Sequence, residues 1–207
     1  MGAMFFVGTV NPAKNISRML RGTERMALFC AGEKAGITLV DTTGLVSGWA
    51  GRALKLGKIR LLKPRHVIAI EKGGELEHIL SAIGADDVRI HRIAPSPSAR
   101  CAGSRARAAW REGKFRDYFM DSDVLKFLPL SVRPIFLRGG SLSGPSGVEV
   151  KRPGCLVGLD KGEETLGLGI FRGAEETGIL VKTPLRPPQA RLIDRVSIGE
   201  VMIEEGI

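Results

Sequence analysis

The sequence predicts an α/β protein in which a parallel sheet with flanking helices is followed by a small all-β domain. In the first part, short apolar runs alternate with longer amphipathic segments, which is the pattern of a parallel sheet with helices on its faces. Beyond Pro129, short β-type runs are separated by Gly and Pro, as in a small barrel or sandwich. The predicted ranges are 1–93 for the α/β domain, 94–128 for an arginine-rich lid or helical segment, and 129–207 for the β-rich domain.

Each element of the α/β part has a local signal. Asn15 is a suitable cap for a helix that continues at helical spacing and ends at Gly36, and a second helix stops before Pro64. The predicted helices cover residues 15–36, 51–62 and 75–83. The predicted strands cover residues 4–8, 37–40, 66–70 and 88–93, with 37–40 buried.

The later part begins with a Pro- and Ser-rich loop at residues 95–98, followed by an arginine-rich helical segment at 100–119. The strands expected after it cover residues 132–138, 155–159, 165–172, 178–183 and 193–203.

Composition limits the class of protein. The chain of 207 residues carries a net charge of +9 and is 43% hydrophobic, which is enough for a packed core and favours polyanionic partners. The longest uncharged run, residues 1–13, is too short to span a bilayer and has no basic flank, so we expect a cytoplasmic protein without a membrane partner. Cys30, Cys101 and Cys155 share no metal-ligand spacing and are expected to be free thiols.

The first candidate site is the tetrapeptide Asp41-Thr42-Thr43-Gly44, directly after an apolar run. At the carboxyl edge of a parallel sheet, hydroxyls and exposed backbone N–H groups can meet a terminal phosphate, and the Asp can reach a Mg²⁺ shell. A plain Asx or Thr turn remains the alternative. The pattern Asp-x-x-Gly also matches a GTPase switch element, but the sequence contains no Asn-Lys-x-Asp guanine motif.

The second candidate is a basic cluster that holds most of the excess charge. Between Arg89 and Arg116, eight basic residues face Glu112 alone, a net charge of seven within 28 residues. Its members are Arg89, Arg92, Arg100, Arg105, Arg107, Arg111, Lys114 and Arg116. Arg107 and Arg111 are four apart, on one helical face, where a guanidinium pair can clamp phosphates and stabilise a phosphoryl-transfer transition state. A solvated helix is the alternative.

An independent nucleoside-triphosphate enzyme of this class needs a phosphate-cradling Gly-x-x-x-x-Gly-Lys-Ser/Thr loop after its first strand. The 207 residues do not contain that pattern. The segment 8–15 has a glycine and a lysine but lacks the second glycine and contains Pro12. We therefore expect no independent catalysis by this chain.

Three motifs together resemble the polynucleotide 5′-hydroxyl kinases of pre-mRNA cleavage, tRNA splicing and rRNA processing, and their archaeal relatives. They are FFVGTVNPAKN at 5–15, DTTGLVSG at 41–48 with the following LKLGKIRLLKPRHVIAIE, and the arginine-rich run ending in FRDYF at 115–119. The later GCLVGLDKG, LGLGIFRG and ILVKTPL resemble the C-terminal β domain of that family. The resemblance implies a partial P-loop NTPase-like sheet for the first domain.

The resemblance also assigns roles. Thr42, Thr43 and Gly44 would occupy the clasp that holds the γ-phosphate, and Asp41 is expected with them among the nucleotide- and phosphate-binding residues. Arg107 and Arg111 would be catalytic lid arginines that neutralise the transferring group. The residues expected to contact the nucleic acid are Arg100, Arg105, Arg116 and Asn11. No metal ligand is expected on this chain.

Such enzymes transfer the γ-phosphate of ATP, with Mg²⁺, to a 5′-hydroxyl of RNA or DNA. The resemblance implies that the chain is the C-terminal portion of such a kinase, inactive alone, with no cofactor held tightly by this chain by itself. A non-catalytic RNA-binding or scaffolding module is the alternative, and a GTPase-like regulator is a distant third. Because neighbouring strand edges of a partial sheet would be bare, we expect either an N-terminal kinase fragment or self-association as a partner.

Overall fold

The computed structural model describes residues 2–84, 88–100, 102–128, 133–136 and 153–203. Contacts divide the chain into two compact units, and each is described by itself. The first, called the α/β unit here, is Asn11–Ala102. The second, called the β unit, combines Met1–Val10 with Gly103–Ile207. The predicted ranges 1–93, 94–128 and 129–207 stay a prediction about independently folding domains.

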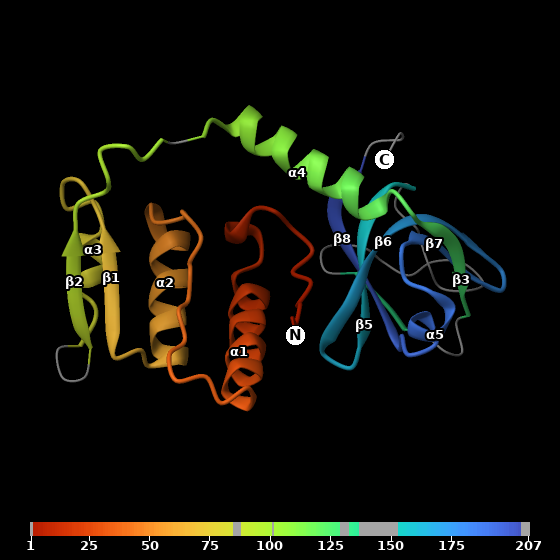
Figure 1. Cartoon of the computed structure of the whole chain (residues 1–207), viewed down its shortest axis with the longest axis horizontal. Coiled ribbons are helices and arrows are strands. Elements are labelled where there is room, and N and C mark those ends of the chain that lie inside the picture. Colours follow the sequence, from red (N-terminus) through yellow and green to blue (C-terminus); the bar gives the residue numbers. More distant parts are fainter. Residues whose placement is uncertain (1, 85–87, 101, 129–132, 137–152, 204–207) are drawn as a thin grey trace. The chain divides into compact units, whose positions relative to one another are not determined.

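The α/β unit contains two long helices and a parallel pair of strands (Figure 1). Its elements in chain order are η1 (Pro12–Lys14), α1 (Ile16–Gly32), α2 (Gly48–Leu62), β1 (His66–Ile70), α3 (Glu77–Leu80) and β2 (Arg89–Ile93). Strands β1 and β2 pair in register from His66 opposite Arg89 to Ile70 opposite Ile93. A parallel pair of this kind requires a crossover, which α3 and its flanking loops supply.

Local side-chain chemistry sets the ends of the helices. The Asn15 side chain accepts a hydrogen bond from the Arg18 amide at 3.2 Å, which confirms the predicted cap of α1. Helix α2 ends at Lys63, whose left-handed backbone (φ 45°) turns the chain just before Pro64. The two helices pack closely at Gly57, where a Cβ would lie 2.9 Å from a Leu20 methyl carbon.

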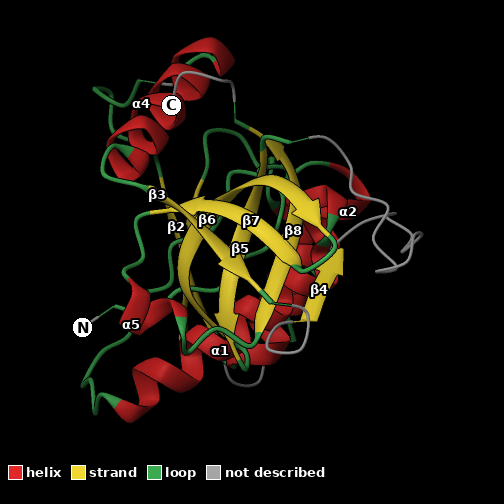
Figure 2. Cartoon of the chain, turned by 90° about the vertical axis from the view of Figure 1, so that its right-hand side faces the viewer, coloured by secondary structure: helices red, strands yellow, loops and turns green. Residues whose placement is uncertain are grey.

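The β unit consists of one long helix and a six-stranded sheet. Its elements are α4 (Ser104–Phe119), β3 (Asp123–Phe127), β4 (Arg133–Phe136), β5 (Cys155–Lys161), β6 (Glu164–Glu175), β7 (Gly178–Thr183), α5 (Pro187–Ala190) and β8 (Arg195–Met202). The strand order is β3-β7-β6-β5-β8-β4, antiparallel except for the parallel pair β4 and β8. Figure 2 shows these strands curving around the core.

Strands β5 and β6 bury side chains on both of their faces. One cluster collects Val157, Phe171, Val181 and Val196 with their neighbours. The other collects Leu156 and Ile170 with Phe119 of α4 and with Phe6 of the N-terminal segment. The two faces of one sheet are therefore covered by different parts of the chain, which explains why these strands read as nearly continuous apolar runs.

A buried carboxylate connects the strands of this core. Asp160 is 3% exposed and accepts hydrogen bonds from the hydroxyls of Thr165 (2.6 Å) and Ser197. The Thr165 hydroxyl oxygen in turn accepts from the Phe6 amide at 2.9 Å. A buried charge costs much less when it is hydrogen-bonded in this way, so the network holds both the sheet and the N-terminal segment in one register.

Two predicted strands are wrong. Residues 4–8 form no strand and pack on the β unit, where the Thr165 amide donates to the Met4 carbonyl and the Glu200 amide donates to the Gly8 carbonyl. Residues 37–40 have no strand partner among the described residues, and Ile37 and Leu39 are 83% and 86% exposed rather than buried. Apolar runs of this length indicate a strand only when a neighbouring strand accepts them.

The predicted α/β class with a following all-β part is confirmed. The third predicted helix is shorter than expected, and β3 was not anticipated at all. Of the predicted strand 132–138, residues 133–136 form β4, and its other positions lie outside the described residues, as does Cys101. In the part of the chain that the structure covers, no helix has the length and apolarity needed to cross a bilayer.

The packing of Phe6 predicts that Gly158 cannot carry a side chain. A Cβ there would lie 2.6 Å from the Phe6 Cβ, which is an overpacked contact close to the backbone. The Gly158→Ala variant should lose about 1–3 kcal/mol of unfolding free energy, measured by denaturant titration. Gly173→Ala, on β6 with no atom within 4 Å, is the control and should stay close to wild type. Equal stability of the two variants would contradict the packing.

Candidate phosphate-binding site

The segment before α2 is held against that helix by close backbone contact. A Cβ on Gly51 would lie 2.4 Å from the Val46 carbonyl carbon, so only glycine permits this approach. The Val46 carbonyl also lies 3.0 Å from the His78 ring Nε2, and Arg52 donates to the His78 carbonyl. The loop, α2 and α3 are thereby fixed together at the amino end of α2.

Lys55 of α2 reaches back to the predicted clasp. Its Nζ donates to the Thr42 hydroxyl at 2.6 Å and to the Thr43 carbonyl. Because the lysine is seven residues beyond the start of α2, it contacts the loop from the side of the helix rather than from its N-terminus. The clasp residues therefore sit beside a fixed positive charge.

A second lysine and a carboxylate complete the cluster. Lys58 lies one turn after Lys55 and is 8% exposed, which is rare for a lysine. Burial lowers the pKa of Lys55, the charge of Lys58 lowers that pKa further, and the Asp41 carboxylate opposes the shift. Burial likewise lowers the pKa of Lys58 against the same carboxylate. Two amines held close together with one carboxylate leave unneutralised positive charge that an anion would relieve.

The threonines supply the polar groups that a phosphate needs. The Thr43 hydroxyl is buried and has no hydrogen-bond partner among the described residues, an uncommon condition for a native polar group. The Thr42 hydroxyl already meets Lys55, while Gly44 is exposed and has open space around it. Hydroxyls, a lysine pair and an unobstructed glycine fit the oxygens of a terminal phosphate. Among the described residues, no group of three or more His, Cys, Asp or Glu could hold a metal ion.

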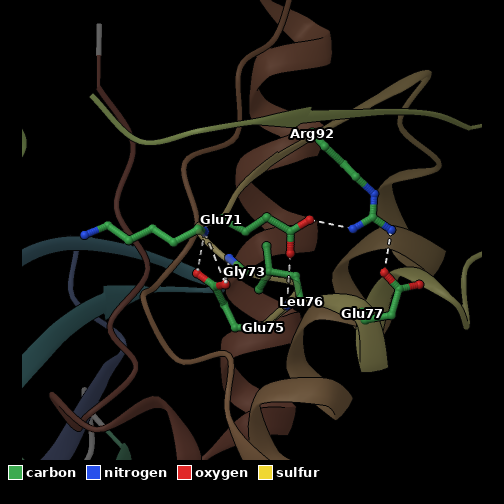
Figure 3. Close-up of polar contacts among 7 residues, drawn as sticks. Glu71, Gly73, Glu75, Leu76, Glu77 and Arg92 are labelled. Carbon is green, nitrogen blue, oxygen red and sulfur yellow. Dashed lines mark hydrogen bonds and ion pairs between the residues drawn. The ribbon is translucent and has the colours of Figure 1, made fainter. Parts of the chain in front are cut away.

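The carboxyl ends of β1 and β2 carry a separate, self-satisfied charge cluster (Figure 3). Arg92 of β2 pairs with Glu71, directly after β1, and with Glu77 of α3 at 2.6 Å. These pairs raise the pKa of Arg92. Glu71 also accepts from the Leu76 amide. Arg92 therefore connects β2 to the end of β1 and to α3. Its charge is neutralised by Glu71 and Glu77, so it is not a free cation of the predicted basic cluster.

In the loop between β1 and α3, a glutamate side chain accepts hydrogen bonds from the backbone amides of the same loop. Glu75 accepts from the amides of Lys72 and Gly73, and these hydrogen bonds lower the pKa of Glu75 (Figure 3). Successive backbone N–H groups of this kind form a small anion-binding concavity. Here the anion is supplied by the chain itself.

The arginines predicted for catalysis lie on α4, in the β unit. Arg107, Arg111 and Lys114 follow the spacing of one helical face. Arg107 is exposed and Arg111 is half-buried. Trp110 is 66% exposed on the same helix, with the Lys114 ammonium 5.9 Å from its ring centre. Cations interleaved with an exposed aromatic ring can bind phosphates and stack on bases.

The other predicted contacts are scattered. Arg105 and Arg116 are eleven residues apart, about three helical turns, so they share the face of α4 opposite Arg107. Arg116 pairs with Glu112 at 3.1 Å. Arg100 is exposed in the loop before α4. Asn11 has a local role, since its side chain accepts from the Ala13 amide at 3.1 Å and caps η1.

The structure thus brings Asp41, Thr42 and Thr43 together with two lysines that the sequence analysis missed. Lys55 and Lys58 lie three apart within an otherwise apolar stretch of α2. That spacing places both amines on one helix side, directly after a polar loop, and was the available signal.

Fold and site together define an α/β protein with an appended β sheet and a candidate phosphate-binding loop. Residues 1–121 match the sequence model described as "mRNA cleavage and polyadenylation factor CLP1 P-loop". The chain belongs to this family, which contains the polynucleotide 5′-hydroxyl kinases, as the resemblance predicted.

Two archaeal proteins named polyribonucleotide 5′-hydroxyl-kinase are similar to this chain. The chain is 35% identical over 120 residues to the polyribonucleotide 5′-hydroxyl-kinase of Methanocaldococcus jannaschii, covering 58% of this chain and 32% of that protein. It is 33% identical over 158 residues to the enzyme of the same name from Pyrococcus furiosus, covering 76% of this chain and 42% of that protein. The chain therefore spans about a third to two fifths of these relatives' length.

The fold has a solved counterpart. A chain from a structure of the extended interface between Pcf11p and Clp1p matches with a TM-score of 0.52 at 10% identity, covering 88% of this chain and 52% of that chain. This likeness concerns the fold alone.

The lowered pKa of Lys55 predicts a pH dependence of stability. The folded state disfavours the charged amine, and this cost disappears as pH rises through the lowered pKa toward the ordinary 10.5. Wild type should therefore gain melting temperature relative to Lys55→Met between about pH 7 and about pH 10, measured by calorimetry. Lys161→Met, at an exposed lysine on β5, is the control and should follow wild type. A constant difference between Lys55→Met and wild type would contradict the shift.

Proposed function

We propose that the chain is the C-terminal portion of an ATP-dependent polynucleotide 5′-hydroxyl kinase, inactive by itself. The observation that carries the proposal is the cluster of Lys55, Lys58 and the Asp41–Thr43 loop, because it offers a terminal phosphate a positive charge and hydroxyl partners at fixed positions. The reaction and the 5′-hydroxyl acceptor, on RNA or DNA, come from the family and its archaeal relatives.

In the complete enzyme, ATP and Mg²⁺ would supply the transferable phosphate and its charge balance. Asp41, Thr42, Thr43 and Gly44 would face the γ-phosphate beside Lys55, and Arg107 and Arg111 of α4 would neutralise the group in transfer. The β-phosphate needs the Gly-x-x-x-x-Gly-Lys-Ser/Thr cradle, whose pattern the sequence does not contain. Tight nucleotide binding by this chain alone is therefore not expected.

The α/β unit also presents surfaces that suit a complementary segment. Parallel sheets are normally covered on both faces and rarely stop at two strands. Several large apolar side chains of this unit are exposed: Ile37, Leu39, Val40, Trp49, Ile68, Ile70, Ile90 and Ile93. We propose that a P-loop-bearing segment of the same family covers them by extending the β1–β2 sheet. A second copy of the chain is the alternative occupant.

Phosphorylation of a 5′-hydroxyl oligonucleotide tests the proposal. The purified chain should transfer no label from γ-labelled ATP, because its sequence does not contain the Gly-x-x-x-x-Gly-Lys-Ser/Thr pattern that cradles the β-phosphate. Adding the P-loop-bearing portion of the Pyrococcus furiosus relative, in trans or fused upstream, should produce transfer. In that assembly Lys55→Met should lower kcat/KM by about 10- to 100-fold, since it removes a charge next to the reacting phosphate.

Lys161→Met serves as the matched control in the same assembly and should keep full activity. Robust transfer by the pure chain would contradict its inactivity. Binding of the added portion without any transfer would contradict the kinase assignment, and an unaltered clean monomer at high concentration in both samples would contradict the sheet extension.

The α4 face favours a second candidate, a non-catalytic RNA-binding module. Arg107, Arg111 and Lys114 lie beside the exposed ring of Trp110, and phosphate contacts of this kind release counterions on binding. Single-strand affinity should then fall steeply with salt. Arg107→Gln/Arg111→Gln should lower affinity for all sequences alike and reduce the log–log salt slope by about 1.4. Affinity indifferent to both salt and these arginines would exclude this module.

A further inference from the structure

We propose a second phosphate site on the α/β unit, at the amino ends of β1 and β2, that takes backbone phosphates of a polynucleotide strand. A cavity of about 540 Å³ opens there, lined by Lys63, Arg65, His66 and Arg89. The lining consists of one lysine, two arginines and one histidine, and none of the described lining residues is a carboxylate. Neither the clasp nor the α4 face includes any of them.

The backbone fixes these side chains around the cavity. The left-handed turn at Lys63 ends α2 and redirects the chain into β1. The Arg89 amide donates to the Arg65 carbonyl at 2.9 Å, and His66 stands opposite Arg89 in the parallel register. Three positive side chains from two separate segments therefore converge on one opening. Lys63 also offsets the partial negative charge at the carboxyl end of α2.

A histidine pair forms one wall. His66 Nδ1 lies 3.0 Å from His91 Nε2, and the ring centres are 5.2 Å apart. A hydrogen bond between two ring nitrogens needs a proton on one and a lone pair on the other, so it sets the orientation of both rings. The pair thus holds the His66 ring in place at the cavity.

The chemistry selects phosphate oxyanions. Guanidinium groups bind phosphate oxygens bidentately, and an ammonium adds a point charge. The lining residues are exposed, so a single phosphate would be held weakly. A strand that presents several phosphates gains from its high effective concentration at neighbouring charges. We therefore assign the site to a phosphodiester backbone rather than to a free nucleotide.

The position relative to the clasp fits one strand. Lys63 follows Lys55 by eight residues, about 12 Å along the α2 axis, within the same unit. A strand whose 5′ end lies at the clasp could reach the cavity with a phosphate a few nucleotides on. The choice of a polynucleotide rests on the proposed function, whereas the anion site itself does not.

The experiment measures binding of a single-stranded 5′-hydroxyl RNA oligonucleotide to the full chain by fluorescence anisotropy at several salt concentrations. The cavity variant is Lys63→Asn/Arg65→Gln/Arg89→Gln, with Asn at the left-handed position because it tolerates that backbone. The control, Lys72→Gln/Lys161→Gln/Arg191→Gln, removes three positive charges from exposed positions away from the cavity. The cavity variant should bind at least about 10-fold more weakly, with a salt slope reduced by about 2. Equal losses in both variants, or no loss, would overturn the proposal.

His66 and His91 give a second readout that does not depend on a substitution. On titration with RNA, the ring signals of both histidines should shift in NMR spectra, and signals that stay unshifted would overturn the proposal. ATP or inorganic triphosphate that produced the same shifts at lower concentration would make a free phosphate compound the ligand. Polyglutamate with equal effect would show charge attraction without phosphate recognition. Either result overturns the assignment to a polynucleotide.

These readouts separate the two proposals. Histidine shifts and a cavity-specific loss of RNA binding, combined with no phosphoryl transfer in the complemented enzyme, would contradict the kinase function and leave the cavity assignment standing. Transfer with unshifted histidines would do the reverse.

Discussion

The contact between Lys55 and the loop at Thr42 and Thr43 is the constraint on which the candidate site depends. It connects the polar loop that begins at Asp41 to helix α2, and the close approach of Val46 to Gly51 holds the end of that loop against the helix. The lysine is held there against the cost of burial and of a second lysine one turn on. Such an arrangement is less favourable without a ligand than with a bound anion, which makes the cluster a candidate functional site.

The two units differ in how completely each buries its own apolar side chains. The β unit closes two apolar clusters around β5 and β6, and its buried Asp160 has hydroxyl partners within the sheet. The α/β unit leaves isoleucines exposed on both of its strands. Burial of apolar surface is the main driving force for a stable sheet. A further chain segment that covered the exposed isoleucines would therefore stabilise the α/β unit, whereas the described part of the β unit already buries its apolar clusters.

The sequence predicted what local chemistry decides. Asn15 as a cap, the strand after Pro64 and the polar loop at Asp41 all depend on neighbours within a few residues, and the structure has them. The errors concern long-range partners. Phe6 has its hydrogen-bond partner 159 residues away, so a strand at 4–8 could not be told from a non-strand segment that packs on a distant part of its own unit. Arg92 looked like free charge because Glu71 and Glu77 lie 21 and 15 residues before it. The spacing of Lys55 and Lys58 was visible in the sequence, but the contact of Lys55 with Thr42, 13 residues away, required the folded structure.

The grouping of Met1–Val10 with Gly103–Ile207 makes the α/β unit an insertion within the β unit. This has a consequence for folding during synthesis. The inserted unit is continuous in sequence and can form as soon as it leaves the ribosome, in keeping with the tendency of domains to fold in order. In the β unit, Phe6 packs against Leu156 and Ile170, and the Thr9 hydroxyl donates to Glu200, so these contacts form only after the C-terminal residues have been synthesised. Contacts of such high sequence separation form slowly, so closure of the N-terminal segment is expected to be the last step of folding.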